Sequence, residues 1–204
     1  MKKVLCFGDS NAFGFNPKDG LRFDEFSRWS GILKNFSKGK FEIIEEGQNN
    51  RTAFSKNPMG KSYTGYKILP EFLKEKFDVV ILALGVNDLQ SQYGATFLDF
   101  ELGISNLIEI VKNNLPNAKI ILVAPTNITQ DVLKSPIFSK LFDESSIEKS
   151  KKLPEIYLEI SKKYNCEFID LNKVAKPSFF DGLHFEPSEH KKIAEEIFKQ
   201  LNKI

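Results

Sequence analysis

Five short apolar runs constrain the fold of this 204-residue chain more than any other feature of its sequence. The runs are Val4–Phe7, Phe41–Ile44, Asp78–Leu84, Lys119–Ala124 and Glu167–Leu171. Each is rich in Val, Ile, Leu or Phe and lacks alternation with polar residues, which is typical of strands buried on both faces. The sequence therefore predicts a parallel sheet that is covered by helices on both sides.

Segments with helical periodicity lie between and after these runs. They are Ser27–Phe36, Tyr66–Lys74, Thr96–Leu115, Ile147–Tyr164 and Glu186–Leu201. Ser27 is the expected N-cap of the first helix, and Pro187 suits the first turn of the last one. Strands that alternate with helices predict an α/β fold, a three-layer α/β/α sandwich with a doubly wound sheet. Because no repeat, low-complexity segment or linker interrupts the pattern, we expect a single domain over residues 1–204.

Charge and hydropathy narrow the classes of partner. The chain has 29 Lys and Arg against 27 Asp and Glu, and its lysines are interleaved with glutamates as on solvated helix faces. This balance predicts no nucleic-acid partner. The apolar run after Lys2 and Lys3 is too short for a signal-peptide core, and no run is long enough to span a bilayer. We therefore expect a cytoplasmic protein with no membrane partner, and two free thiols at Cys6 and Cys166.

A serine, an aspartate and a histidine occupy the loops that a parallel sheet brings to one edge. Ser10 follows the first run directly, in Gly8-Asp9-Ser10-Asn11, and Asp181 and His184 precede the last helix. Open α/β sheets bind their ligands at this edge. Activation of a serine requires a base, and the base requires an orienting acceptor. The sequence therefore predicts Ser10 as nucleophile, His184 as general base and Asp181 as the acid that orients it, a chain order compatible with such a triad.

Two further loops after strands supply candidate donors for an oxyanion. Gly47 follows the second run, Asn87 follows the third, and Ser10 contributes its own backbone N–H. Asp88 and Asp9 are interpreted as residues that stabilise their loops. His190 lies in a charged helical pattern, Glu189-His190-Lys191-Lys192, and is expected to be solvated.

Aromatic residues and one long segment surround these candidates. Phe13 and Phe15 flank the serine loop, and Phe179 and Phe180 precede Asp181, so these side chains could line an acyl or aryl pocket or simply belong to the core. The segment 127–146 is long enough to reach over the site as a lid. Its apolar residues could equally form a subunit contact in a homo-oligomer.

Four of these blocks, in this order, resemble the SGNH (GDSL-type) hydrolases. The blocks are Gly8-Asp9-Ser10, Gly47, Gly85-Val86-Asn87-Asp88 and Asp181-Gly182-Leu183-His184. The resemblance implies a flavodoxin-like α/β/α fold, a Ser10–Asp181–His184 triad, and an oxyanion hole made by Ser10, Gly47 and Asn87. It implies no metal and no organic cofactor.

The chain departs from the family pattern at two positions. Asn11 replaces the leucine that follows Gly-Asp-Ser, as in members that resemble arylesterases and carbohydrate acetylesterases. Asn50 stands where a glycine usually precedes Arg51-Thr52, although asparagine tolerates positive φ better than most residues.

The resemblance implies a serine esterase whose partner is a small-molecule ester: an acetyl or short-chain, aryl or carbohydrate ester. A lysophospholipase- or thioesterase-like acylhydrolase is the alternative within the family. A flavin- or nucleotide-binding module and a pseudoenzyme that only binds are alternatives outside it. The chain has no Gly-x-Gly-x-x-Gly or Gly-Lys-Ser/Thr loop after the first strand, which disfavours the nucleotide-binding alternative.

Overall fold

A five-stranded parallel sheet forms the centre of the molecule in a computed structural model that describes all 204 residues. The strand order is β2-β1-β3-β4-β5, and every neighbouring pair is parallel. The strands are β1 (Lys2–Gly8), β2 (Phe41–Gly47), β3 (Val79–Ala83), β4 (Lys119–Ala124) and β5 (Glu167–Asp170). All five predicted strands are therefore present, and the predicted α/β fold with a parallel sheet is confirmed.

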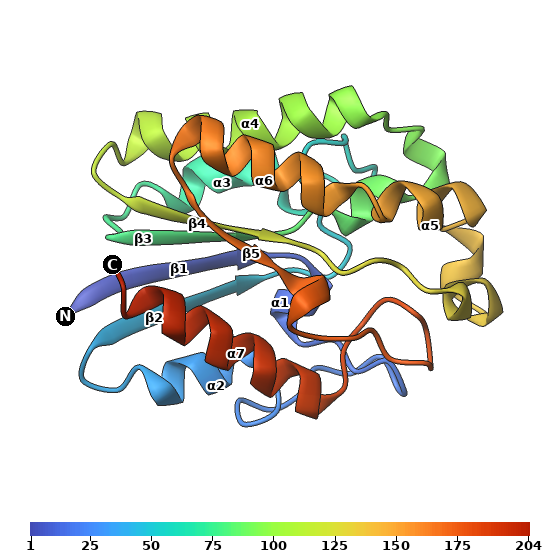
Figure 1. Ribbon diagram of the computed structural model, residues 1–204, viewed down its shortest axis with the longest axis horizontal. Coiled ribbons are helices and arrows are strands. Elements are labelled where there is room, and N and C mark those ends of the chain that lie inside the picture. The colour runs from blue at the N-terminus through green and yellow to red at the C-terminus, as the bar shows by residue number, and fades with distance from the viewer.

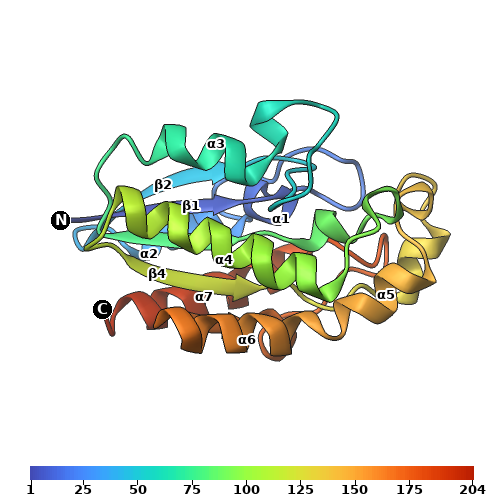
Figure 2. The same ribbon diagram turned by 90° about the horizontal axis from the view of Figure 1, so that it is seen from above.

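Helices cover both faces of the sheet (Figure 1). The helices α3 (Gly65–Phe72), α4 (Phe97–Asn114) and α6 (Leu153–Tyr164) lie on one face, and Figure 2 shows them side by side on the viewer's side of the sheet. The opposite face carries α2 (Trp29–Phe36) and α7 (Pro187–Leu201). The remaining helices are the short α1 (Ser10–Phe13) and α5 (Glu144–Ser150).

Alternation along the strands supplies the two cores. In β1, Leu5 and Phe7 point into the larger apolar cluster, under α3, α4 and α6, whereas Val4 and Cys6 point into the smaller one, under α2 and α7. Strands β3 and β4 divide their side chains in the same way. Successive side chains of a strand face opposite sides of the sheet, so a strand buried on both faces must be apolar at every position.

Two predicted helical details differ from the structure. The single helix predicted for Ile147–Tyr164 is two helices, α5 and α6, and α6 begins with Pro154 in its first turn. Proline is well suited to that position because its missing N–H would have no helical acceptor there. The expected cap Ser27 is also wrong, because α2 begins at Trp29 after Arg28 and has no side-chain cap from its own segment.

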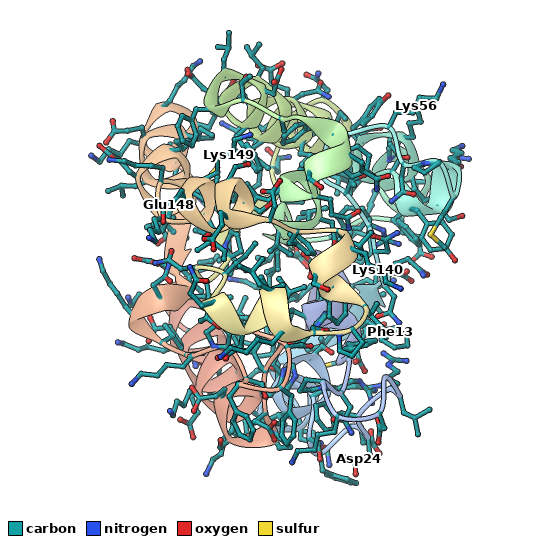
Figure 3. The ribbon with its side chains drawn as sticks, turned by 90° about the vertical axis from the view of Figure 1, so that its right-hand side faces the viewer. Phe13, Asp24, Lys56, Lys140, Glu148 and Lys149 are labelled. Atoms are coloured by element: carbon teal, nitrogen blue, oxygen red, sulfur yellow. The ribbon has the colours of Figure 1, made fainter.

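The carboxyl ends of the strands all meet at one edge, which Figure 3 shows facing the viewer. The segment between β4 and α5 crosses this face. Figure 3 labels Lys140 of this segment and Phe13 of α1 on the same face. Two short 3₁₀ helices, Gln130–Lys134 and Phe138–Lys140, lie within that segment. Two others, Val86–Leu89 and Ser91–Tyr93, follow β3. No helix is both long enough and apolar enough to cross a membrane.

Candidate active site

Ser10 is the first residue of α1, immediately beyond the carboxyl end of β1. Asp9 caps this short helix, because its carboxylate accepts the N–H of Asn11 at 3.0 Å. The turn depends on Gly8, since a Cβ there would lie 2.4 Å from Ala12 Cβ and 2.6 Å from Ala83 O. The sharp strand-to-helix turn at Gly8 holds Ser10 with only 5% of its surface exposed.

Ser10, His184 and Asp181 form one hydrogen-bonded chain. The distance from His184 Nε2 to Ser10 Oγ is 2.8 Å, and the distance from His184 Nδ1 to Asp181 Oδ2 is 2.6 Å. All three residues are buried. An ionised carboxylate only accepts hydrogen bonds, so the proton of this pair lies on Nδ1. Nε2 is then left as the acceptor for the Ser10 hydroxyl.

The Asp181 carboxylate is itself held by its own loop. Its Oδ1 atom accepts the N–H groups of Leu183 and His184 at 3.0 and 2.9 Å. Gly182 has a φ of 67°, and a Cβ there would lie 2.6 Å from Val132 N. The loop can therefore pass close to the segment 127–146, where Thr129 N–H donates to Gly182 O at 3.0 Å. The three predicted residues are thus brought together by contacts that fix each side chain.

Asn87 lies in the 3₁₀ turn after β3 with its side-chain amide buried. Its Nδ2 donates to Arg51 O at 3.0 Å, and its Oδ1 accepts from Gln90 Nε2 at 3.1 Å. An amide NH₂ group has two hydrogens, so one N–H of Asn87 remains for another acceptor. Sequence reasoning missed Gln90. The only sequence signal for a role of Gln90 is that it is a polar residue close to Asn87, a candidate donor, in the same loop.

Gly47 ends β2, where it is paired with Gly8. Gln48 N–H donates to Gly8 O, and in a parallel ladder this pattern turns the N–H of Gly47 away from β1. A Cβ on Gly47 would lie 2.1 Å from Phe13 N, so the glycine is required by the close approach of α1. Gly47 as an oxyanion donor stays a prediction, and the direction of its N–H counts against it.

Asn50 lies three residues further along the same loop with a φ of 60°. Its carbonyl accepts from Asn57 Nδ2 at 2.8 Å and its Oδ1 accepts from Gln90 Nε2 at 2.8 Å. Its backbone N–H, like that of Ser10, has no acceptor within the protein. Asparagine is one of the few residues that adopt this left-handed conformation readily. Asn50 therefore adopts the left-handed turn conformation at the position where the family pattern usually has a glycine.

Asp88 stabilises its loop, as expected from the sequence. Its carboxylate accepts the N–H groups of Ala53, Phe54 and Ser55 at 2.6, 3.0 and 2.7 Å. Burial raises the pKa of Asp88 to about 6, against the opposing effect of these hydrogen bonds. The side chain thereby ties the loop after β3 to the loop after β2.

Asp9 and Arg51 are the other charged groups buried beside Ser10. Burial raises the pKa of Asp9 to about 7 and lowers the pKa of Arg51 to about 10. Arg51 donates to the carbonyls of Gly8 and Glu46 and lies 4.5 Å from the centroid of the Phe7 ring. Asp9 serves as the cap of α1, which agrees with its expected role as a turn stabiliser. Arg51 thereby connects the ends of β1 and β2, and Asp9 holds the start of α1.

His190 is not solvated, contrary to the sequence prediction. The side chain is fully buried between Phe23 and Phe185, with ring centroids 5.6 and 5.8 Å away. Its Nδ1 accepts the N–H of Trp29 at 3.4 Å, so it supplies the cap that α2 lacks from its own segment. Burial lowers the pKa of His190 to about 3. The charged neighbours misled the prediction, because His190 occupies the single inward position among them.

Two phenylalanines cover the imidazole of His184. Phe15 and Phe138 lie with ring centroids 4.3 and 5.1 Å from the His184 ring, and 6.0 Å from each other. Phe138 belongs to the segment 127–146, so this segment covers the site within one chain, as a lid would. Phe179 and Phe180 instead stack on each other and are 71% and 42% exposed.

Neither a metal site nor a disulfide is found in the structure. No group of three or more His, Cys, Asp or Glu side chains is close enough to hold a metal ion. Cys6 and Cys166 are both free thiols.

A parallel α/β sheet with a serine–histidine–aspartate chain at its carboxyl edge defines the class of serine hydrolases. The sequence model of one family in this class, the GDSL-like lipase/acylhydrolase family, matches residues 4–197. The chain belongs to this family and is an ester-hydrolysing enzyme. This result favours the esterase interpretation over the flavin-binding alternative.

Solved structures with the same fold include proteins that are named as esterases. The chain is 29% identical to an M. smegmatis aryl esterase, with a TM-score of 0.92 and 100% and 99% of the two chains covered. It is 27% identical to a carbohydrate acetylesterase from Sinorhizobium meliloti, with a TM-score of 0.92 and the same coverage. A lipolytic protein of the G-D-S-L family from Veillonella parvula, 15% identical with a TM-score of 0.73, shares the fold. No curated protein sequence matches the chain.

Proposed function

We propose that the protein hydrolyses esters of short acyl groups, with Ser10 as nucleophile, His184 as general base and Asp181 as its orienting carboxylate. The observation that carries this assignment is the continuous chain of two short hydrogen bonds, 2.8 Å from Oγ to Nε2 and 2.6 Å from Nδ1 to Oδ2. A nucleophile, a base and an orienting group within hydrogen-bond reach are the requirements for an activated serine.

The reaction proceeds in two half-reactions through an acyl-enzyme. Ser10 Oγ attacks the ester carbonyl while its proton passes to His184 Nε2. The imidazolium then protonates the leaving alcohol, the C–O bond breaks and the acyl group stays on Oγ. Water attacks this ester with the same histidine as base, which releases the carboxylic acid and restores the serine. Asp181 remains ionised and stabilises the imidazolium in both halves.

Three donors are available for the oxyanion that forms on the carbonyl oxygen. They are the free N–H of Ser10, the second amide N–H of Asn87 and the free N–H of Asn50. Fixed donors of this kind stabilise charge that develops only in the transition state. The proposal therefore keeps Ser10 and Asn87 and replaces Gly47 by Asn50.

The aromatic wall on His184 supports a preference for aryl leaving groups. The histidine that protonates the leaving alcohol is covered by Phe15 and Phe138, so that alcohol departs beside two aromatic rings. Aromatic pairs contribute about 0.5–1.5 kcal/mol beyond the burial of their area. The names of the structural neighbours, an aryl esterase and a carbohydrate acetylesterase, support small acyl esters as the substrate class.

A fluorophosphonate probe combined with an ester panel tests the proposal. The probe should label one serine per chain in the wild type and in Ser188→Ala, an exposed-serine control, but not in Ser10→Ala. The same variant should lose hydrolysis of 4-nitrophenyl acetate and of acetylated sugars. Undiminished labelling or turnover in Ser10→Ala would show that another residue is the nucleophile.

A further inference from the structure

A buried glutamine amide joins two of the loops around Ser10. Gln90 follows the 3₁₀ turn of Asn87 and is only 2% exposed. Its Nε2 atom donates to Asn50 Oδ1 at 2.8 Å and to Asn87 Oδ1 at 3.1 Å. Both hydrogens of the Gln90 amide are thus used, one on the loop after β2 and one on the loop after β3.

The orientation of each amide in this cluster is determined by its other partners. Asn87 Nδ2 faces a carbonyl, that of Arg51, so Oδ1 must be the atom that faces Gln90. Gln90 Oε1 accepts from Gln92 Nε2 at 2.8 Å, which leaves Nε2 for the two asparagines. The cluster is therefore consistent in every donor and acceptor, and a rotated amide would place like groups against each other.

The same two asparagines hold donors that the proposed mechanism uses. The terminal torsion of an asparagine side chain is broad and weakly restrained by itself. Without Gln90, the Asn87 Oδ1 atom would be buried with no protein partner, and the Asn50 side chain would lose the bond that ties its loop to Asn87. Oxyanion donors act by being fixed in place before the reaction, so loss of this restraint weakens them.

We infer that Gln90 is a positioning residue for the oxyanion hole: its amide clamps Asn50 and Asn87 so that their free N–H groups stay directed at the ester oxygen. This inference rests on the proposed function. It assigns to Gln90 no contact with the substrate, only control over the two groups that make such contacts.

The first test replaces Gln90 by methionine, which has the same length and no amide. Gln90→Met should lower kcat for 4-nitrophenyl acetate on the order of tenfold, less than the roughly 10²–10³-fold loss expected on removal of a donor itself. KM should change by no more than about twofold. The inhibition constant of a trifluoromethyl ketone, which forms an oxyanion on Ser10, should rise by the same factor as kcat falls, because both report transition-state binding.

A double-mutant cycle with Asn50→Gly tests the link between the loops. Glycine keeps the positive φ and the backbone N–H of residue 50 but removes the Oδ1 atom that Gln90 holds. Asn50→Gly should lower kcat, and its effect should be much smaller in the Gln90→Met background, because the two changes break the same contact. Gln200→Met, on α7 far from the site, is the matched control and should keep the wild-type kcat and inhibition constant.

Three results would overturn the inference while the proposed function stands. The first is a folded Gln90→Met enzyme with wild-type kcat and inhibitor affinity. The second, which applies even when Gln90→Met does not fold, is an Asn50→Gly enzyme with wild-type kcat. The third is strict additivity of the two variants. If the wild type shows no Ser10-dependent hydrolysis, the proposed function itself fails, and that result is distinct from all of these.

Discussion

Two aspartates near Ser10 have opposite surroundings. Asp181 accepts two backbone N–H groups and the His184 ring, so its charge is stabilised by three donors. Asp9, next to the serine, accepts one N–H from Asn11 and is otherwise enclosed by the sheet and α1. Its raised pKa follows from this burial. Asp9 therefore caps the helix, but its ionised form is destabilised by burial.

We expect Asp9→Asn to stabilise the protein at neutral and alkaline pH. The pKa of an unfolded aspartate is about 3.9, and that of Asp9 is raised by burial to about 7. Between these values the folded state holds a proton that the unfolded state has released, so the wild-type free energy of unfolding falls as pH rises. Asparagine can cap the helix without titrating.

Urea denaturation at pH 4.5 and pH 8 measures this effect. The free energy of unfolding of Asp9→Asn relative to wild type should increase by at least about 1 kcal/mol between the two pH values. Asp19→Asn, which removes an exposed carboxylate, should show no comparable change. An Asp9→Asn difference that is the same at both pH values would contradict the prediction.

At this scale the sequence was informative where chemistry requires a particular side chain. Ser10, Asp181 and His184 were predicted as a group because few other functional groups can replace them. The donor role of Gly47 stays a prediction, because the direction of a backbone N–H depends on strand register, which the residue type does not report. The contribution of Gln90 was not predictable, since it depends on two amides from different loops meeting in space.

The His190 ring of α7 accepts a hydrogen bond from the first residue of α2 and so connects these two helices. The unfolded histidine pKa is about 6.5, and burial lowers that of His190 to about 3. Between these values the unfolded state binds a proton that the folded state excludes, so stability is lost as pH falls through this window. His190→Asn keeps an acceptor and does not titrate. It should therefore lose less stability than wild type on acidification.

Thermal unfolding between pH 7.5 and pH 4.5 checks this expectation. His190→Asn should melt below wild type at pH 7.5, because it leaves space between Phe23 and Phe185, and the gap should narrow at pH 4.5. Lys191→Asn, on the exposed side of the same helix, should keep the wild-type pH dependence. A gap that stays constant or widens would show that His190 is not the titrating group.

The segment 127–146 contacts the His184 ring through the aromatic ring of Phe138. Phe138→Ala should lower kcat/KM for 4-nitrophenyl acetate about 2- to 10-fold more than for ethyl acetate, since only the aryl leaving group stacks on that ring. Phe179→Ala, which removes an exposed ring with no contact to His184, should affect both esters little. Equal losses for the two esters in Phe138→Ala would indicate that Phe138 serves only to pack the segment.

Element prediction succeeded where burial dominates and was less accurate at helix ends. The central strands β1, β3 and β4 are apolar on both faces, and short runs of this kind are typical of buried strands. The helix break between Ser150 and Leu153 and the missing Ser27 cap were not predicted, because a helix end depends on single residues and their contacts, which periodicity does not report. The cap of α2 comes from His190, 161 residues away in sequence.

For the whole molecule, the esterase and lysophospholipase interpretations differ in the acyl chain they accommodate. The segment 127–146 covers the site, with Phe138 against the His184 ring, and this cover limits the room for a long acyl chain. We expect kcat/KM for 4-nitrophenyl esters to peak at acetyl or butyryl and to drop sharply for longer chains. Even a 1 Å displacement of the carbonyl can cost about 10²-fold. A rate that rises steadily to dodecanoyl would support the lysophospholipase or thioesterase alternative.

The hydrogen bond between Ser10 and His184 spans 174 residues of sequence, and this separation makes activity a measure of assembly. A ribosome makes the serine before β2, β3, β4 and β5, and the histidine only after all of these strands. A nascent chain therefore carries an inert hydroxyl until the loop before α7 docks against the end of β1. Appearance of esterase turnover during refolding should accordingly coincide with the slowest native phase, and the protein provides its own enzymatic signal for completed folding.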